Sequence, residues 1–357
     1  MKNYSVFFTN YTIGTDVYQE VADICLHDGN KVLLIGGETA LNAAESRLKS
    51  AMKNSGLEIV DTVVYGTDCT YENIRKWSAY ALECKADMIF GMGGGKALDT
   101  AKGAAEMAGL PVYTFPTIAA TCAASTALSV VYKEDGNFDS FYFFDKPARH
   151  CFIDLQVIAN APCEYLRAGM GDTIGKHFEC HFAARGDELD HSSLLGREIS
   201  NLCYAPLVEH GVKALNDCRE HEATYELQQA VLANIISTGL VSLLVVDDYN
   251  CAVAHSVYYG LVLLPGFENR YLHGDVVAYG VLVQLAIDGQ KGAAKELKAF
   301  LKELGIPSTL REMRVDTKRE ALDEVLRETA NGPDMEHIPY EITEDMIYDA
   351  ILEVECL

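Results

Sequence analysis

Residues 86–102 read ADMIFGMGGGKALDTAK, an apolar run that leads into a glycine-rich turn and then into helix-forming residues. Glycines in such a turn let the backbone approach a phosphate, and the amides that begin the following helix can bind it. Lys96 adds positive charge at the same place. The spacing differs from G-x-G-x-x-G, so a purely structural turn is the alternative. The stretch predicts a strand, a tight turn and a helix, with dinucleotide binding at the turn as a hypothesis.

The sequence around this turn alternates strand and helix patterns, as βαβ units do. Between the first two expected strands, apolar residues recur at helical spacing, and Thr70 is placed to cap a further helix. The strands expected in one continuous sheet are KVLLIGG (31–37), EIVDTVVYG (58–66), ADMIFGMG (86–93), PVYTFPT (111–117), LSVVY (128–132) and HCFIDL (150–155).

After about residue 160 the strand patterns stop, and long apolar segments at helical spacing succeed one another. A chain of 357 residues is also longer than one hydrophobic core usually serves. We therefore expect an α/β dinucleotide-binding domain over residues 1–160 and an all-helical domain for metal and substrate over residues 161–357.

Composition excludes several classes of function. A net charge of −23 argues against nucleic acid and against an anionic membrane surface as partners. Eleven cysteines, an odd number without C-x-x-C spacing, are typical of reduced thiols and indicate a cytoplasmic protein. The N-terminal MKNYSVFFTN is too short an apolar run for a signal peptide, and we expect no membrane-spanning helix.

Three polar residues fall in apolar helical sequence of the second half. Asp172 lies in AGMGDTIGK, His255 in CAVAHSVYYGL and His273 in RYLHGDVVAYG. Pro265 and Gly266 interrupt the helix between the two histidines, so two helices can aim both imidazoles at one point. Three nitrogen and oxygen ligands would leave a coordination position open for substrate, as catalytic metal sites do. A metal and a dinucleotide together indicate hydride transfer.

A second histidine pair competes for this role. His177 and His181 are four residues apart, but His177 lies five residues after Asp172, about 500° of helix rotation, and so on another face. We exclude the pair from the Asp172 site. Partly exposed polar positions are the simpler interpretation.

The motifs GGGK-x-LDTAK, PTIAAT, LSVVY, AGMGDT, AHSVYYGL and LHGDVVAYG, in this order, resemble the glycerol dehydrogenase group of the metal-dependent, iron-containing type of alcohol dehydrogenases. The resemblance covers essentially the whole chain. It implies the dehydroquinate synthase-like architecture, a nicotinamide cofactor, and a zinc or iron ion held by Asp172, His255 and His273. It also implies a homo-oligomer, a dimer or larger ring.

The resemblance places the cofactor contacts on the first half of the chain. Those residues are Gly37, Gly93, Gly94, Gly95, Lys96, Asp99, Thr117, Ala120, Thr126, Leu128 and Tyr132. Asp99 has an alternative role, which is to neutralise Lys102. The choice between NAD and NADP stays open. Glu38, which lies one residue from the usual position of the ribose-binding carboxylate, favours NAD.

Two departures from the group concern the substrate. Cys122 stands where glycerol dehydrogenases usually carry an aspartate that binds a polyol, and Lys176 stands where iron-type relatives often carry a fourth ligand. Lys176 lies one turn after Asp172, where it could bind a substrate carboxylate or pair with Asp172 and displace the metal. Arg270 is a second candidate anion partner, with a surface cation as the simpler interpretation.

The runs PTIAATCAA and GDTIGK, which contain Cys122 and Lys176, are most similar to the hydroxycarboxylate dehydrogenase branch of the group. We therefore expect an NAD(P)-dependent oxidoreductase that interconverts a small 2-oxo acid and its 2-hydroxy acid, with Cys122 lining the pocket. The alternatives are a glycerol or other polyol dehydrogenase, a lyase of the dehydroquinate synthase type, and a dinucleotide-sensing protein without turnover.

Overall fold

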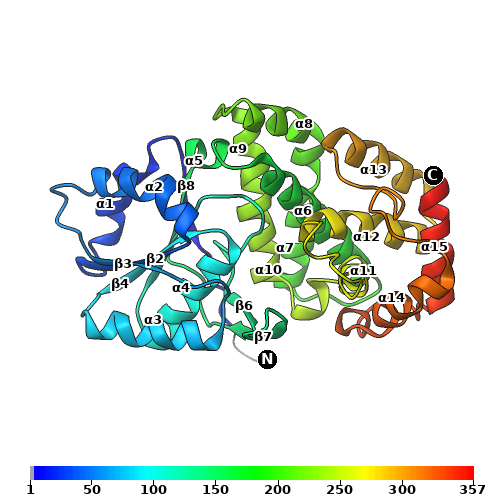
Figure 1. Cartoon of the computed structure of the whole chain (residues 1–357), viewed down its shortest axis with the longest axis horizontal. Helices are drawn as coiled ribbons and strands as arrows, with labels where there is room; N and C mark the ends of the chain where they lie inside the picture. Colours follow the sequence, from blue (N-terminus) through cyan, green and yellow to red (C-terminus); the bar gives the residue numbers. More distant parts are fainter. Residues whose placement is uncertain (1–3) are drawn as a thin grey trace. The chain divides into compact units, whose positions relative to one another are not determined.

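The structure is a computed structural model that describes residues 4–357, and the first three residues of the N-terminal MKNYSVFFTN lie outside it. The chain divides into two compact units of distinct architecture (Figure 1). The first unit comprises residues 4–163 and Asp217–Val231, and the second comprises Glu164–Asn216 and Leu232–Leu357. A boundary at residue 160 stays a prediction, and the return of residues 217–231 to the first unit was not anticipated.

The first unit is built on a six-stranded parallel sheet in the order β1-β8-β5-β4-β2-β3. The strands are β1 (Asn10–Gly14), β2 (Lys31–Gly36), β3 (Glu58–Val64), β4 (Met88–Gly93), β5 (Val112–Pro116) and β8 (His150–Asp154). The helical elements of this unit are η1 (Val17–Glu20), α1 (Val21–Cys25), α2 (Glu38–Ala51), α3 (Tyr71–Glu83), α4 (Gly95–Ala108), α5 (Leu155–Ala159) and α9 (Tyr225–Leu232, whose last residue belongs to the second unit). The parallel α/β fold is thus as expected, because β2, β4 and β8 are buried over nearly their whole length.

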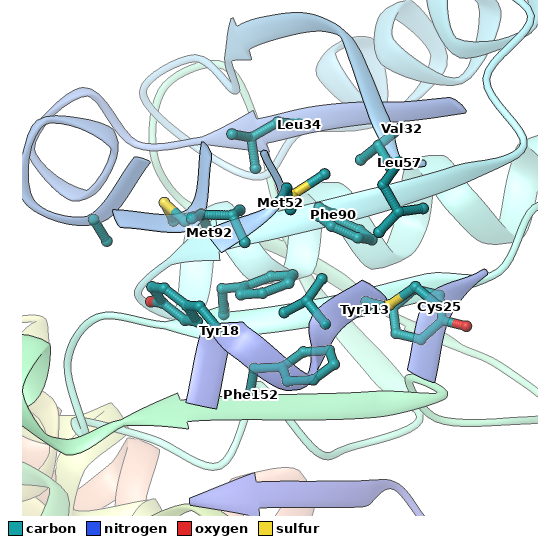
Figure 2. Packing of buried hydrophobic residues seen from close by; sticks show 14 of the residues in the cluster. Tyr18, Cys25, Val32, Leu34, Met52, Leu57, Phe90, Met92, Tyr113 and Phe152 are labelled. Carbon is teal, nitrogen blue, oxygen red and sulfur yellow. The ribbon is translucent and has the colours of Figure 1, made fainter. Parts of the chain in front are cut away.

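A cluster of aliphatic and aromatic side chains forms one core of this unit (Figure 2). Phe115 stacks on Phe152 with ring centroids 5.0 Å apart, and Phe90 lies 4.9 Å from Phe115. These rings come from β4, β5 and β8, so they fix the order of the central strands through packing on one face of the sheet.

Two features of the sheet differ from expectation. LSVVY does not continue the sheet: β6 (Leu128–Tyr132) pairs only with β7 (Phe138–Phe143), in a separate antiparallel ribbon. A tight turn at Gly136, where φ is +85°, returns the chain and makes this hairpin. The edge strand β1 was not predicted, because its residues are partly exposed and form no apolar run.

The second unit is helical, and no strand follows β8 in residues 4–357. Its elements are α6 (Cys163–Ala183), α7 (His191–Ile199), η2 (Ser200–Cys203), α8 (Ala205–Arg219, whose last three residues belong to the first unit), η3 (Ala233–Ser237), α10 (Thr238–Leu244), η4 (Asp247–Tyr249), α11 (Val253–Val262), α12 (His273–Ile287), α13 (Lys291–Leu304), α14 (Arg319–Asn331), η5 (Pro333–Met335) and α15 (Glu344–Cys356).

One helical run is longer and more apolar than we expected. α9 (Tyr225–Leu232), the π-helical η3 and α10 form a continuous 20-residue helix, long and apolar enough to cross a membrane by length and composition alone. In its most apolar window, 61% of the residues are buried inside the protein, as in the core helix of a globular fold.

Candidate metal centre and glycine-rich turn

Asp172, His255 and His273 converge on one point of the helical unit. Asp172 Oδ1 lies 3.6 Å from His255 Nε2 and 3.5 Å from His273 Nε2. A cation bound at about 2.1 Å by tetrahedrally arranged ligands would hold its donor atoms about 3.4 Å apart. The donor set and its spacing therefore fit a divalent zinc or iron ion with an open position. Among residues 4–357 this is the one group of at least three His, Cys, Asp or Glu side chains with such convergence.

The close approach of α6 and α12 makes this convergence feasible. A Cβ atom at Gly274 would lie 1.8 Å from the Ala168 carbonyl oxygen, and one at Gly171 would lie 2.2 Å from the Gly274 oxygen. Only glycine fits at both positions. The helix backbones are thus in direct contact beside Asp172 and His273.

A buried carboxylate that the sequence analysis missed, Glu179, holds His255. Glu179 Oε2 lies 2.6 Å from His255 Nδ1, and Oε1 accepts hydrogen bonds of 2.8 Å from the amides of Ala252 and His255. Its side chain is 0% exposed. The signal was present in the sequence, because Glu179 follows Asp172 by seven residues, two helical turns, and so shares its face.

Burial raises the pKa of Asp172, but the hydrogen bonds and charges of His255 and His273 outweigh this and hold the pKa well below its usual range. Asp172 is therefore a carboxylate at neutral pH. Tyr258 packs edge-on against His273, with ring centroids 4.3 Å apart, and restricts that ring.

Lys176 lies on the same face of α6, and its ammonium is buried. Nζ donates to the main-chain oxygen of Asn250 at 2.7 Å and to its Oδ1 at 3.1 Å. Lys176 and Glu179 thus both bind the main chain that leads into α11. Lys176 donates to a carbonyl oxygen there, and Glu179 accepts from two amides. Arg270, by contrast, is exposed and donates to the Gly266 carbonyl at 3.2 Å, as a surface cation does.

The glycine-rich turn joins β4 to α4 as predicted. Gly93 ends the strand with φ of +148°, and a Cβ there would lie 2.8 Å from the Ala97 Cβ. Gly94 caps the helix, and a Cβ there would lie 2.7 Å from Ile118. Gly95 begins α4. The turn is bound to its neighbours by hydrogen bonds from the Thr117 amide to the Gly93 oxygen and from the Gly37 amide to the Met92 oxygen.

Three of the residues expected near the cofactor surround a buried lysine. Lys102 Nζ lies 3.0 Å from Asp99 Oδ1 and donates to Thr126 Oγ1 at 3.1 Å and to the Leu128 oxygen at 2.5 Å. Asp99 also accepts from the Val130 amide at 3.2 Å. Burial raises the pKa of Asp99, while Lys102 and Val130 act in the opposite direction. Asp99 thus pairs with Lys102 and ties the β6–β7 ribbon to α4, while its expected contact with the cofactor stays a prediction.

The remaining candidates lie nearer the surface of the first unit. Lys96 pairs with Asp68, and its ammonium lies 4.8 Å above the Tyr132 ring. Cys122 and Ala120 are partly buried, and the Cys122 oxygen accepts from the Ser125 amide at 2.9 Å. Glu38 is exposed at the start of α2.

Comparison with known proteins identifies the family of the chain. The sequence profile described as iron-containing alcohol dehydrogenase matches residues 9–150. The chain is 30% identical over 352 residues to a glycerol dehydrogenase of Escherichia coli O6:H1, covering 96% of this chain and 94% of the relative. It is 33% identical over 329 residues to hydroxycarboxylate dehydrogenase A of Escherichia coli K12, covering 91% of this chain and 90% of the relative.

The fold also matches that of a solved structure. The crystal structure of glycerol dehydrogenase from Schizosaccharomyces pombe superimposes with a TM-score of 0.90 at 25% identity, covering 100% of this chain and 91% of that one.

Proposed function

Because the chain belongs to the iron-containing alcohol dehydrogenase family, we propose that it transfers a hydride between a nicotinamide cofactor and a small 2-oxo acid or 2-hydroxy acid. That it is an oxidoreductase follows from the family. The single observation that carries the metal-assisted mechanism is the convergence of Asp172, His255 and His273. The identity of the substrate, the choice between NAD and NADP and the choice between zinc and iron are parts of the proposal.

A divalent cation held by these three side chains would supply Lewis-acid polarisation of the substrate carbonyl. Asp172 contributes the negative charge of the ligand set. Glu179 accepts the Nδ1 proton of His255 in a hydrogen bond, so the Nε2 lone pair faces Asp172 and would be free to bind the ion. Tyr258 and the α6–α12 contact keep His273 in place.

The glycine-rich turn would bind the cofactor pyrophosphate. Glycines at residues 93, 94 and 95 present main-chain amides at the N-terminus of α4, a helix of 14 residues. Bound there, a reduced nicotinamide would supply the hydride. Glu38 at the start of α2 favours NAD, because a carboxylate repels the 2′-phosphate of NADP.

Two features favour a carboxylate-bearing substrate. Lys176 places a buried positive charge one turn from Asp172. Its ammonium is held in place because it donates two hydrogen bonds to oxygens of Asn250. Cys122 replaces an acidic residue that would repel an anion. A relative of comparable identity named as a hydroxycarboxylate dehydrogenase agrees with this choice.

A glycerol or other polyol dehydrogenase is the second candidate, since a relative aligned over nearly the whole chain bears that name. A cofactor-coupled screen of 2-oxo acids, aldehydes and polyols with NAD and NADP tests both. We expect NADH consumption with 2-oxo acids. Strong glycerol oxidation without 2-oxo acid reduction would establish the second candidate, and no net change in NADH with any substrate would favour the lyase or the sensing protein.

We also propose a cytoplasmic homo-oligomer. The eleven cysteines are all free thiols, as expected in a reducing compartment. Size measurement of the purified protein in solution tests the oligomeric state.

A further inference from the structure

A pocket of about 170 Å³ lies in the helical unit between residues of α6 and residues at the end of α12. Its lining includes His177 and His181 of α6 and Gln284 of α12, none of which takes part in the Asp172 site. The two histidines are the pair that the sequence analysis excluded from that site.

Both imidazoles are held through one nitrogen by a main-chain carbonyl. His177 Nδ1 donates to the Ser200 oxygen over 3.1 Å, and the Arg197 carbonyl accepts a hydrogen bond from His181. A carbonyl can only accept, so the other nitrogen of each neutral ring, Nε2, carries the lone pair. Burial lowers the pKa of His177 to about 4 and also lowers the pKa of His181, so both rings are neutral at physiological pH.

Two of the acceptor atoms at this pocket are buried without a donor. In residues 4–357, no donor lies within hydrogen-bond distance of His181 Nε2 or of Gln284 Oε1. Gln284 is 2% exposed, and its amide nitrogen donates to the Phe178 oxygen at 3.1 Å, which orients Oε1 away from that carbonyl. A buried acceptor without a donor costs stability unless something electron-poor fills the pocket.

We propose that this pocket is a second divalent-metal site, in which His177 Nε2, His181 Nε2 and Gln284 Oε1 bind an ion such as Zn²⁺. The ring centroids of the two histidines are 4.7 Å apart. Two imidazoles that share a tetrahedral zinc at about 2.1 Å have ring centres about 5 Å apart, so the spacing of these two rings fits a shared ion. Imidazole nitrogen selects zinc, nickel, copper or cobalt over magnesium and calcium.

Two arginines lie near the pocket, and each has a carboxylate partner, although the charge of Arg197 still acts on His181 and lowers its pKa. Arg185, which also lines it, is neutralised by Asp288 through hydrogen bonds of 2.7 and 2.6 Å. Arg197 lies beside Glu198, with 3.2 Å between the guanidinium and the carboxylate.

The second ion would join the same two helices that carry Asp172 and His273. Gln284 lies eleven residues after His273, about 16 Å along α12. The two helices touch at Gly171 and Gly274 near the first site and again at Phe178 and Gln284. An ion at the second site would therefore stabilise the far ends of α6 and α12 without contacting the substrate.

The test is the zinc content of the unmodified full-length protein and of its variants. It is measured by elemental analysis after equilibration with zinc and removal of the excess. We expect two ions in the unmodified chain, one in His181→Ala, one in Asp172→Ala and none in the double variant. We also expect that Asp172→Ala still gains thermal stability on adding zinc and that the double variant does not. His210→Ala, which alters a histidine of α8 that lines neither site, should retain two ions.

The cysteines provide an alternative source of bound metal, which cobalt(II) distinguishes. A spectrum without thiolate charge-transfer bands in Asp172→Ala supports histidine and amide ligands. The proposal is overturned if His181→Ala binds as many ions as the unmodified chain, or if the cobalt spectrum of Asp172→Ala shows thiolate ligation. His177→Ala, at a partly exposed position, repeats the test should His181→Ala fold poorly. Failure of the Asp172 site alone leaves one ion that disappears in His181→Ala.

Discussion

Glu179 joins the N-terminus of α11 to the imidazole of His255 with a single carboxylate. One oxygen accepts from the amides of Ala252 and His255, and the other lies 2.6 Å from His255 Nδ1. α11 has no side-chain cap of its own, so Glu179 from α6 takes that role. The side chain thereby orients the helix and selects the ring tautomer that binds a metal.

Glu179→Gln should weaken metal binding by about 10–100-fold. The amide oxygen can still accept from both backbone amides, but the amide nitrogen can only donate to Nδ1, which forces the ring proton onto Nε2. Competition with a chelator measures the affinity. Glu355→Gln is the control, because Glu355 is also buried and accepts from a backbone amide, that of Leu310, at 2.6 Å. Equal losses in both variants would show that Glu179 acts only through stability.

Gly274→Ala should destabilise the helical unit by at least about 1–3 kcal/mol, the usual range for overpacking. The added Cβ would lie 1.8 Å from the Ala168 oxygen, so α6 and α12 must separate, and the metal affinity should fall as well. Gly292→Ala in α13 is the control, since a Cβ there has no neighbour within 4 Å. It should be neutral or stabilising by up to about 1 kcal/mol. Denaturant unfolding compares the two, and similar stabilities would contradict the close helix contact.

Lys176→Ala should raise the Michaelis constant for 2-oxo acids on the order of tenfold or more, and for uncharged aldehydes much less. The reason is the loss of a buried charge beside the substrate carboxylate. Asn250→Ala serves as the comparison, because it removes one partner of Lys176 but keeps the ammonium. If Lys176→Ala affects both substrate classes equally, Lys176 only holds the Asn250 segment.

His150→Phe should make the protein less sensitive to acid. Burial lowers the pKa of His150 to about 4, below the ordinary value of 6.5. The unfolded chain therefore binds a proton as the pH falls below about 6.5, whereas the folded chain binds it only near pH 4, so stability is lost across this window. Phenylalanine retains packing on Phe152, where the ring centroids are 4.5 Å apart. Melting temperatures at pH 7 and pH 5 should differ less in the variant; an unchanged difference would assign the acid sensitivity to other groups.

The strands that are clearest in the sequence are those whose residues are buried along nearly their whole length. Buried strands such as β2 and β4 read as continuous apolar runs, and Thr70 caps α3 through a hydrogen bond to the Asn73 amide. The strands β1 and β7 were not expected because their partly exposed residues form no such run, and β6 was expected as a strand but assigned to the wrong sheet. The position of β6 depends on tertiary contacts, among them the hydrogen bonds from Lys102 to Thr126 and Leu128.

The three side chains that the sequence offers as metal ligands lie together in the structure, but the residues that hold them in place were not expected. Asp172, His255 and His273 were recognisable because polar residues in apolar helices need a reason. The hydrogen bonds of Glu179 and the engagement of Lys176 by Asn250 join residues more than 70 positions apart, which spacing along one helix does not reveal. The contact of Asp99 with Lys102 was one of the two roles that the sequence left open for this residue.

Asp172, Lys176 and Glu179 occupy one stripe of α6, at intervals of four and three residues. Inserting or deleting a single residue between Asp172 and Glu179 would turn everything beyond it by about 100°. At least one of the three side chains would then leave the face that they share. Homologous enzymes that share this arrangement should therefore vary freely in the letters of this segment that face elsewhere, and never in its length.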